Sequence, residues 1–183
     1  SLREDLRRVL ERARDELRKL SKELKEVLKR SRDNIRKLSE DVKRANERTE
    51  EEIRRLTKEI DKDELREILE RVLRTSTELV KELNKRNRDV LRENERLVRE
   101  VDKINKDAAR EVTKLVEELD RVDKDEIFKR VKKEIKELVD RVREVNKDVI
   151  RRMKKSNDEV KRENEKVIRE SEKLLKDVED ARR

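Results

Sequence analysis

Residues 56–72 read LTKEIDKDELREILERV, and this stretch decides how many helices the chain forms. Before it, apolar residues recur every three or four positions and end at Leu56 and Ile60. A helix continued at about 3.6 residues per turn would place apolar residues near positions 64 and 67, but both are glutamates. The apolar stripe restarts at Leu65, about 150° further around the helix axis. One helix therefore ends here and a second begins.

A repeated tetrapeptide marks a second interruption of the same kind. Residues 61–64 read DKDE, and so do residues 123–126, where the stripe slips again. Aspartate is a favourable N-cap, and acidic side chains stabilise a helix start because they interact with its free N–H groups. We therefore expect three helices, at about 2–60, 64–121 and 126–181, with turns near 61–63 and 122–125. Short connections make neighbouring helices antiparallel, so the prediction is a single up-down-up bundle over residues 1–183.

A longer period predicts little supercoil. Leu2, Leu20, Leu38 and Leu56 are each 18 residues apart. Eighteen residues in five turns give about 3.6 per turn, the period of a straight α-helix, whereas a strict seven-residue repeat imposes a left-handed supercoil. The fold class that we predict is all-α, an antiparallel three-helix bundle of long, nearly straight helices.

The composition leaves few chemistries open. Of the 183 residues, 57 are Lys or Arg and 49 are Asp or Glu, which gives a net charge of +8, and 31% are hydrophobic. Gly, Pro, Cys, His, Trp, Tyr and Gln do not occur. Disulfides, thiolate or imidazole metal sites, Gly-rich phosphate loops and His- or Cys-based catalysis require these absent residues. We therefore expect no enzymatic activity, no cofactor and no metal site.

Three local patterns have chemical interpretations that their context disfavours. Ser156 beside Lys154 and Lys155 is better explained as a core serine next to solvated lysines than as a nucleophile with its base. The triplet at 50–52 is all glutamate but lacks the loop oxygens of a cation site. Basic runs at 129–133 and 151–155 favour weak, salt-dependent adhesion to nucleic acid without specific recognition, because a single aromatic residue cannot stack successive bases.

Neutral polar residues fall inside the apolar stripes. With turns centred near 62 and 124, residue i of the first helix lies level with residues 124 − i and 124 + i of the other two. Under this rule, which we call the level rule, the neutral polar residues form four cross-sections. They are Ser21 with Asn105 and Asn146; Ser31 with Asn94, Ser156 and Asn157; Ser39 with Asn87 and Asn164; and Asn46 and Thr49 with Ser76 and Ser171. A buried amide without partners costs about 1–3 kcal/mol, so we interpret these as hydrogen-bonded layers that specify fold and register.

Four polar residues are expected to meet solvent instead. Asn34 and Asn84 fall in the second and third cross-sections but lie at the edge of the stripe, and Thr57 and Thr113 have no neutral polar residue at their level. The second helix has the widest apolar stripe, so a homodimer, the alternative to the monomer that we expect, would use it. The longest apolar run is two residues, which predicts a soluble chain without a membrane span or native localisation, cytoplasmic on recombinant expression.

The 18-residue repeat, the polar layers and the alphabet without Gly or Pro resemble de novo designed three-helix bundles. The similarity is greatest to parametrically generated bundles with buried hydrogen-bond networks, although the absence of Gly after each helix departs from common practice. The resemblance implies a thermostable structural scaffold without a natural biochemical function. The alternative is a designed self-associating or partner-binding helical module that uses the stripe of the second helix. The chain does not resemble natural spectrin-type repeats, because those have shorter helices and an aromatic core.

Overall fold

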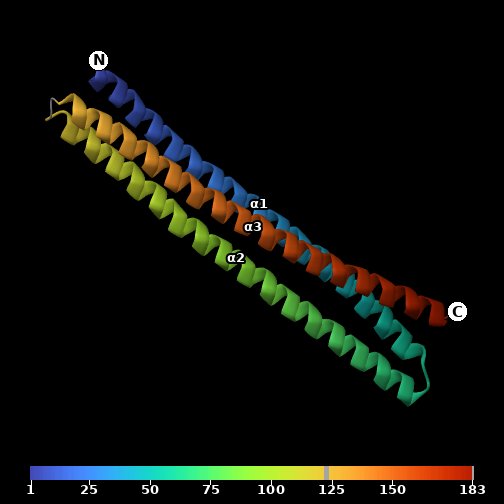
Figure 1. Ribbon diagram of the computed structural model, residues 1–183. Helices are drawn as coiled ribbons and strands as arrows, with labels where there is room; N and C mark the ends of the chain where they lie inside the picture. The colour runs from blue at the N-terminus through green and yellow to red at the C-terminus, as the bar shows by residue number, and fades with distance from the viewer. Residues whose placement is uncertain (122–123, 183) are drawn as a thin grey trace. The chain divides into compact units, whose positions relative to one another are not determined.

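The computed structural model describes residues 1–121 and 124–182, with side chains described up to residue 180 outside that gap. These residues form three helices, α1 (Leu2–Glu59), α2 (Asp63–Leu119) and α3 (Asp125–Arg182), and no strand (Figure 1). The predicted all-α, three-helix bundle is confirmed. The straightness of the helices and the single domain over 1–183 stay predictions.

The helix ends follow from the acidic tetrapeptides. Asp63 and Glu64 lie in the first turn of α2, and the Arg66 amide donates to the Lys62 carbonyl at 3.2 Å. The Arg66 side chain also donates to the Ile60 carbonyl at 2.8 Å, which satisfies an acceptor at the end of α1. No described residue has a positive φ, so the chain leaves α1 without the left-handed residue that glycine normally provides. The second predicted turn includes residues 122–123, which lie outside the described residues.

The chain divides into two compact units. Unit 1 comprises Ser1–Arg30 and Glu93–Lys154, and unit 2 comprises Ser31–Arg92 and Lys155–Arg183. Each unit contains a segment of every helix. Unit 1 is held by two apolar clusters, one that includes Leu17, Val112 and Ile135 and one that includes Leu24 and Met153. Burial of each large apolar side chain contributes about 1.5–3 kcal/mol. In both clusters all three helices supply side chains to one core.

Contacts inside unit 1 set the direction of α2 against α1. Arg7 Nη2 lies 2.9 Å from Asp120 Oδ1, and the Arg14 guanidinium donates to the Thr113 hydroxyl. Residue numbers rise along α1 while they fall along α2, so these segments are antiparallel. Glu16 of α1 also pairs with Arg143 of α3.

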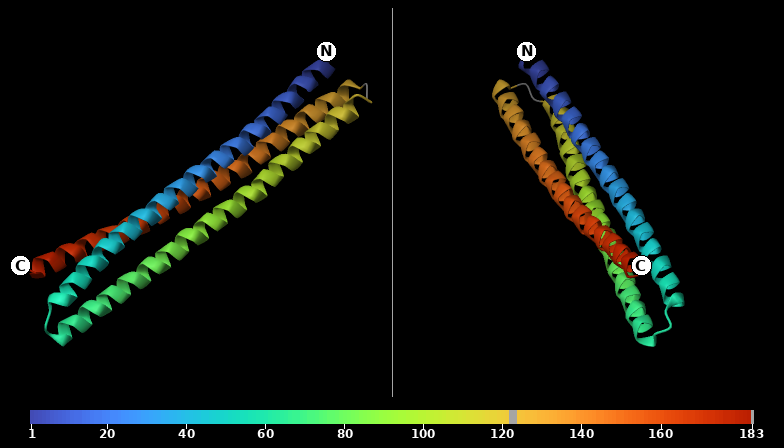
Figure 2. Two further views of the ribbon diagram at one scale, coloured as in Figure 1. Left: turned by 180° about the vertical axis from the view of Figure 1, so that it is seen from behind. Right: turned by 90° about the vertical axis from the view of Figure 1, so that its right-hand side faces the viewer.

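Unit 2 shows the full up-down-up order. Its core cluster comprises Val42, Val80 and Leu83, with Val167 and Ile168 packed against it. Side-chain hydrogen bonds join α1 to α2 in antiparallel order and α1 to α3 in parallel order; they are Ser39 to Asn87, Asn46 to Ser76, Ser31 to Asn157 and Thr49 to Ser171. Both views of Figure 2 show the connection between α1 and α2 reversing the chain within this unit.

Candidate functional site

The polar layers are the candidate site, and the structure places all fourteen predicted residues in the interior or at its edge. Eight are buried and six are half-buried; none is exposed. The buried ones are Ser31, Thr49, Asn87, Asn94, Asn105, Asn146, Asn164 and Ser171. The half-buried ones are Ser21, Ser39, Asn46, Ser76, Ser156 and Asn157. Every buried polar residue of the described chain thus belongs to the predicted set.

The first layer, in unit 1, joins three helices through one amide pair. Asn105 Nδ2 donates to Ser21 Oγ and to Asn146 Oδ1, both at 3.0 Å. Asn146 Nδ2 returns a bond to Asn105 Oδ1 at 2.7 Å and donates to the Val142 carbonyl at 2.8 Å. All four amide hydrogens are therefore used, and both Asn side chains, at most 2% exposed, are satisfied. The level rule placed residues 103 and 145 opposite Ser21, within two positions of Asn105 and Asn146.

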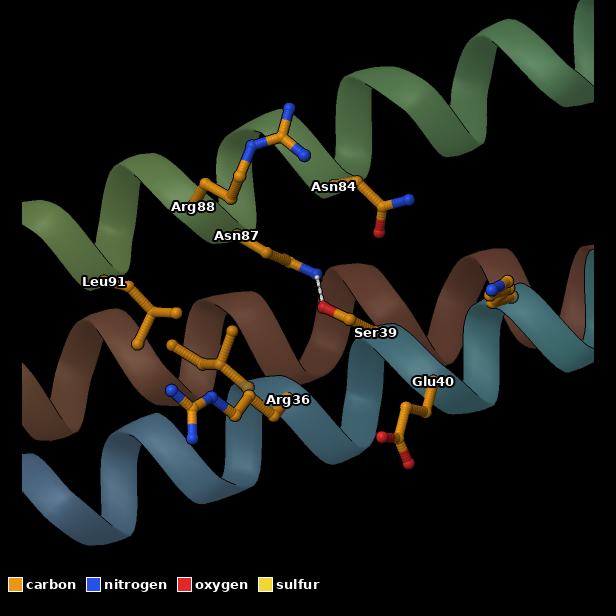
Figure 3. A pocket seen from close by; sticks show the side chains of 9 residues that line it. Arg36, Ser39, Glu40, Asn84, Asn87, Arg88 and Leu91 are labelled. Atoms are coloured by element: carbon orange, nitrogen blue, oxygen red, sulfur yellow. Dashed lines mark hydrogen bonds between the residues drawn. The ribbon is translucent and has the colours of Figure 1, made fainter.

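The second complete layer, in unit 2, has the same connectivity. Asn87 Nδ2 donates to Ser39 Oγ and Asn164 Oδ1, both at 3.0 Å; the bond to Ser39 is drawn in Figure 3. Asn164 Nδ2 donates to Asn87 Oδ1 at 2.9 Å and to the Val160 carbonyl at 2.7 Å. Each of its three layer residues lies 18 positions from its counterpart in unit 1. The 18-residue repeat therefore includes the hydrogen bonds as well as the apolar seam.

Within unit 2, one hydrogen bond joins α1 to α3 in the second predicted layer. Ser31 Oγ donates to Asn157 Oδ1 at 2.7 Å within unit 2. The other members of that layer are Asn94, buried in unit 1, and Ser156, half-buried in unit 2.

The last layer separates into two pairs. Ser76 Oγ donates to Asn46 Oδ1 at 3.2 Å, while Thr49 Oγ1 lies 3.4 Å from the Ser171 carbonyl oxygen. Neither pair joins α2 to α3, unlike the two complete layers.

Sequence reasoning missed one carboxylate at the first layer. Asp102 has a side chain only 14% exposed, with Lys106 Nζ at 2.9 Å and Lys25 Nζ at 3.8 Å. Burial raises the pKa of Asp102, but the hydrogen bonds from Lys106 and Ser21 and the charge of Lys25 outweigh burial and lower it. A charged residue three positions before Asn105, on the inward side of α2, was the available signal.

Asn84 takes the place of this carboxylate in unit 2. It lies 18 positions before Asp102, and Lys43 and Arg88 correspond in the same way to Lys25 and Lys106. Asn84 extends from α2 toward α1 (Figure 3), but its buried Oδ1 accepts no hydrogen bond from any described residue. It borders a groove of about 380 Å³ that also contains Ser39 and Asn87. In unit 2 a neutral amide thus lies beside Lys43 and Arg88, whereas in unit 1 a carboxylate pairs with the corresponding lysines.

Of the four polar residues expected at the surface, only Asn34 is exposed. Asn84, Thr57 and Thr113 are half-buried. The Thr113 hydroxyl accepts from Arg14 Nη2 at 3.0 Å and donates to the Ala109 carbonyl at 3.0 Å, so an arginine supplies the partner that no neutral residue at its level offers. Thr57 donates to the Ile53 carbonyl of its own helix at 2.7 Å. The level rule compared neutral residues alone and so overlooked arginine as a donor.

The chemistry of these layers is that of matched neutral donors and acceptors. The serine hydroxyls accept from Asn amides in both complete layers. In the acidic triplet, Glu50 and Glu52 pair with Arg54 and Arg55 of the same helix, at 2.6 Å and 3.4 Å. Among the described residues no three acidic side chains cluster as metal ligands would, and no helix carries an apolar stretch long enough for a membrane crossing.

No family model matches this chain, and comparison with curated proteins and with solved structures finds no match either.

Proposed function

We propose that this chain is a designed structural scaffold whose function is to fold as specified, without catalytic activity. The observation that carries the proposal is the pair of identical layers in units 1 and 2, in which every Asn amide hydrogen has an acceptor. A half-satisfied polar layer is worse than an apolar core, so complete layers are tolerated only in arrangements that bring each amide to its partners. They therefore select among arrangements of the helices more than they add stability.

The rest of the chain supports the same function. Core positions are apolar, and the outer faces carry ion pairs within single helices, such as Arg96 with Glu93 and Glu100. Exposed pairs of this kind contribute about 0.2–0.5 kcal/mol each and keep the surface polar. We further propose a soluble, thermostable monomer that needs no partner and, expressed recombinantly, stays in the cytoplasm.

The test replaces the buried amide pair of unit 2 by Asn87→Leu with Asn164→Leu. We expect the denaturation midpoint to be maintained or raised, because leucines bury apolar area, while oligomers or several conformers appear in light scattering and amide NMR spectra. The matched control is Asn34→Leu, which adds a leucine at an exposed position. A double variant that remains one monomeric conformer would sink the proposal.

A second candidate function, partner binding or self-association through α2, is favoured by one observation. Of the five exposed large apolar residues in the described chain, four lie on α2, namely Leu65, Ile68, Leu79 and Ile104. Light scattering across a hundredfold concentration range tests the self-association form. A mass that stays at 22.4 kDa supports the monomer, and a rising mass supports self-association.

A further inference from the structure

An apolar stripe on α2 of unit 2 faces away from the core. Leu65, Ile68 and Leu79 are 46%, 52% and 47% exposed, and half-buried Val72 lies between them. The spacings of three, four and seven residues are those of the a and d positions of a coiled coil. We name Leu65, Ile68, Val72 and Leu79 the outer stripe. It presents a helix-packing seam for which unit 2 has no further helix.

A groove continues the outer stripe toward α3. It has a volume of about 390 Å³ and is lined by Val72 and Leu79 of α2 and by Val167 and Leu174 of α3. Thr75, Ser76 and Ser171 also border it. At this level Ser76 bonds to α1, and no Asn pair joins α2 to α3 as in the complete layers. The two helices therefore leave between them an apolar groove beside an exposed seam.

The charged residues along the outer stripe and its groove are mixed, with more glutamates than arginines, although the whole chain is basic. The residue before each member of the outer stripe is charged: Glu64, Glu67, Arg71 and Glu78. Glu170 of α3 and Arg71 of α2 both line the groove. None of these four glutamates forms an ion pair with a described residue, whereas many glutamates elsewhere do. A partner with basic flanks would neutralise them.

We propose that the outer stripe and its groove bind an amphipathic helix with an apolar a/d face and Lys or Arg at the flanking positions. The inference rests on the second candidate function, since it names the partner that α2 would bind. The stripe spans about 21 Å at about 1.5 Å per residue, so the partner helix needs about four turns. A second copy fits less well, because antiparallel pairing of two α2 helices sets the glutamate flank against itself.

The experiment titrates a fluorescent 21-residue helical peptide with Leu at a and d and Lys at the flanking positions, and measures anisotropy. One control peptide carries Glu at the flanks, and another keeps Lys but has Ser at a and d. We expect the Lys peptide to bind at least tenfold more tightly than either control at low ionic strength. That advantage over the Glu peptide should shrink in 0.5 M salt, where the charges are screened.

Variants of the protein locate the binding. Ile68→Asp and Leu79→Asp should each lower the affinity for the Lys peptide at least tenfold. Ile104→Asp, at an exposed position of α2 in unit 1, should leave this affinity unchanged. Because all three side chains are exposed, circular dichroism should show an intact fold. Glu67→Lys with Glu78→Lys should reverse the preference between the Lys and Glu peptides.

The possible results distinguish the basic partner helix from the second candidate function, partner binding or self-association through α2. If the Lys and Glu peptides bind equally and Ile68→Asp abolishes both, partner binding through α2 stands and the basic partner is wrong. If no peptide binds while the mass of the chain alone rises with concentration, self-association stands and the inference is overturned. If no peptide binds and the chain remains monomeric, both are overturned.

Discussion

Asp102 and Asn84 occupy the same position of α2, one 18-residue repeat apart, and the first is a charged carboxylate whereas the second is a neutral amide. In unit 1 Asp102 Oδ2 lies 2.9 Å from Lys106 Nζ, while Asp102 Oδ1, which has no hydrogen-bond partner among the described residues, lies 3.8 Å from Lys25 Nζ. In unit 2 the buried Oδ1 of Asn84 has no described partner, although Lys43 and Arg88 stand at the corresponding positions. The two positions provide a comparison, within one chain, of a buried charge with a neutral amide.

Asn84→Asp should stabilise the protein at pH 7. The new carboxylate gains Arg88, four residues on, and Lys43 across the groove, and it can accept from the Ser39 hydroxyl as Asp102 does from Ser21. We expect a gain of about 0.5–1 kcal/mol, since the position is half-buried and the cations are solvated. Urea denaturation at low salt measures it. Asn84→Ala is the control, and an Asp variant no more stable than the Ala variant would refute the comparison with unit 1.

Asp102 should make stability depend on pH in the acid range. Its folded pKa is lowered, because the lysines and Ser21 outweigh burial, and so lies below the unfolded value of about 3.9. The stabilisation is therefore complete above about pH 4 and is lost as the pH falls through the folded pKa. We expect wild type to exceed Asp102→Asn in unfolding free energy at pH 7, with the difference disappearing toward pH 2. A difference independent of pH would contradict this.

Asn105 and Asn146 should be strongly coupled. Asn105→Leu or Asn146→Leu alone leaves the opposite amide with unmatched groups in the core, which costs about 1–3 kcal/mol. The double variant removes both amides and should lose less than the sum of the two single losses, with a coupling energy of about 1–3 kcal/mol. A double-mutant cycle by chemical denaturation measures this coupling. Additive losses would show that the reciprocal bonds contribute nothing to stability.

Truncation of the small cluster in unit 1 should be costly. Leu24 and Met153 are fully buried there, and Leu24→Ala or Met153→Ala should each destabilise by about 2–5 kcal/mol through lost contacts and a cavity. Leu2→Ala, at a position 37% exposed, is the control and should cost less than about 1 kcal/mol. Equal losses at Leu24 and Leu2 would show that burial does not govern stability.

The helices and the composition of the layers were predictable because both follow from periodicity. The phase slip near Asp61 ended one stripe and began another, and the helices end within two residues of the predicted positions. Inward polar residues such as Asn105 and Asn146 were recognisable because each replaces an apolar residue of the stripe. Their bonds followed once the two turns set the levels.

The remaining contacts were not predictable because long charged side chains reach beyond their own level. Asp102 looked like another surface carboxylate, although its position in α2 turns it inward beside Ser21. Arg14 reaches Thr113 in the same way and gives a threonine expected at the surface a partner. The exposed members of the outer stripe were not predictable, because the apolar stripe of one helix does not reveal which of its residues the neighbouring helices cover.

The two complete layers have the same hydrogen-bond connectivity, and this has a consequence for how the helices assemble. A helix displaced along its neighbours by eighteen residues would offer Asn87 to Ser21 in place of Asn105, with the same donors and acceptors. The amide pairs therefore exclude small displacements but accept this large one. What forbids it in the intact chain is the connection between Glu59 and Asp63, which is only three residues long. Cleavage of that connection would leave helices able to join in staggered order, and the discrete bundle could then grow into an open fibre.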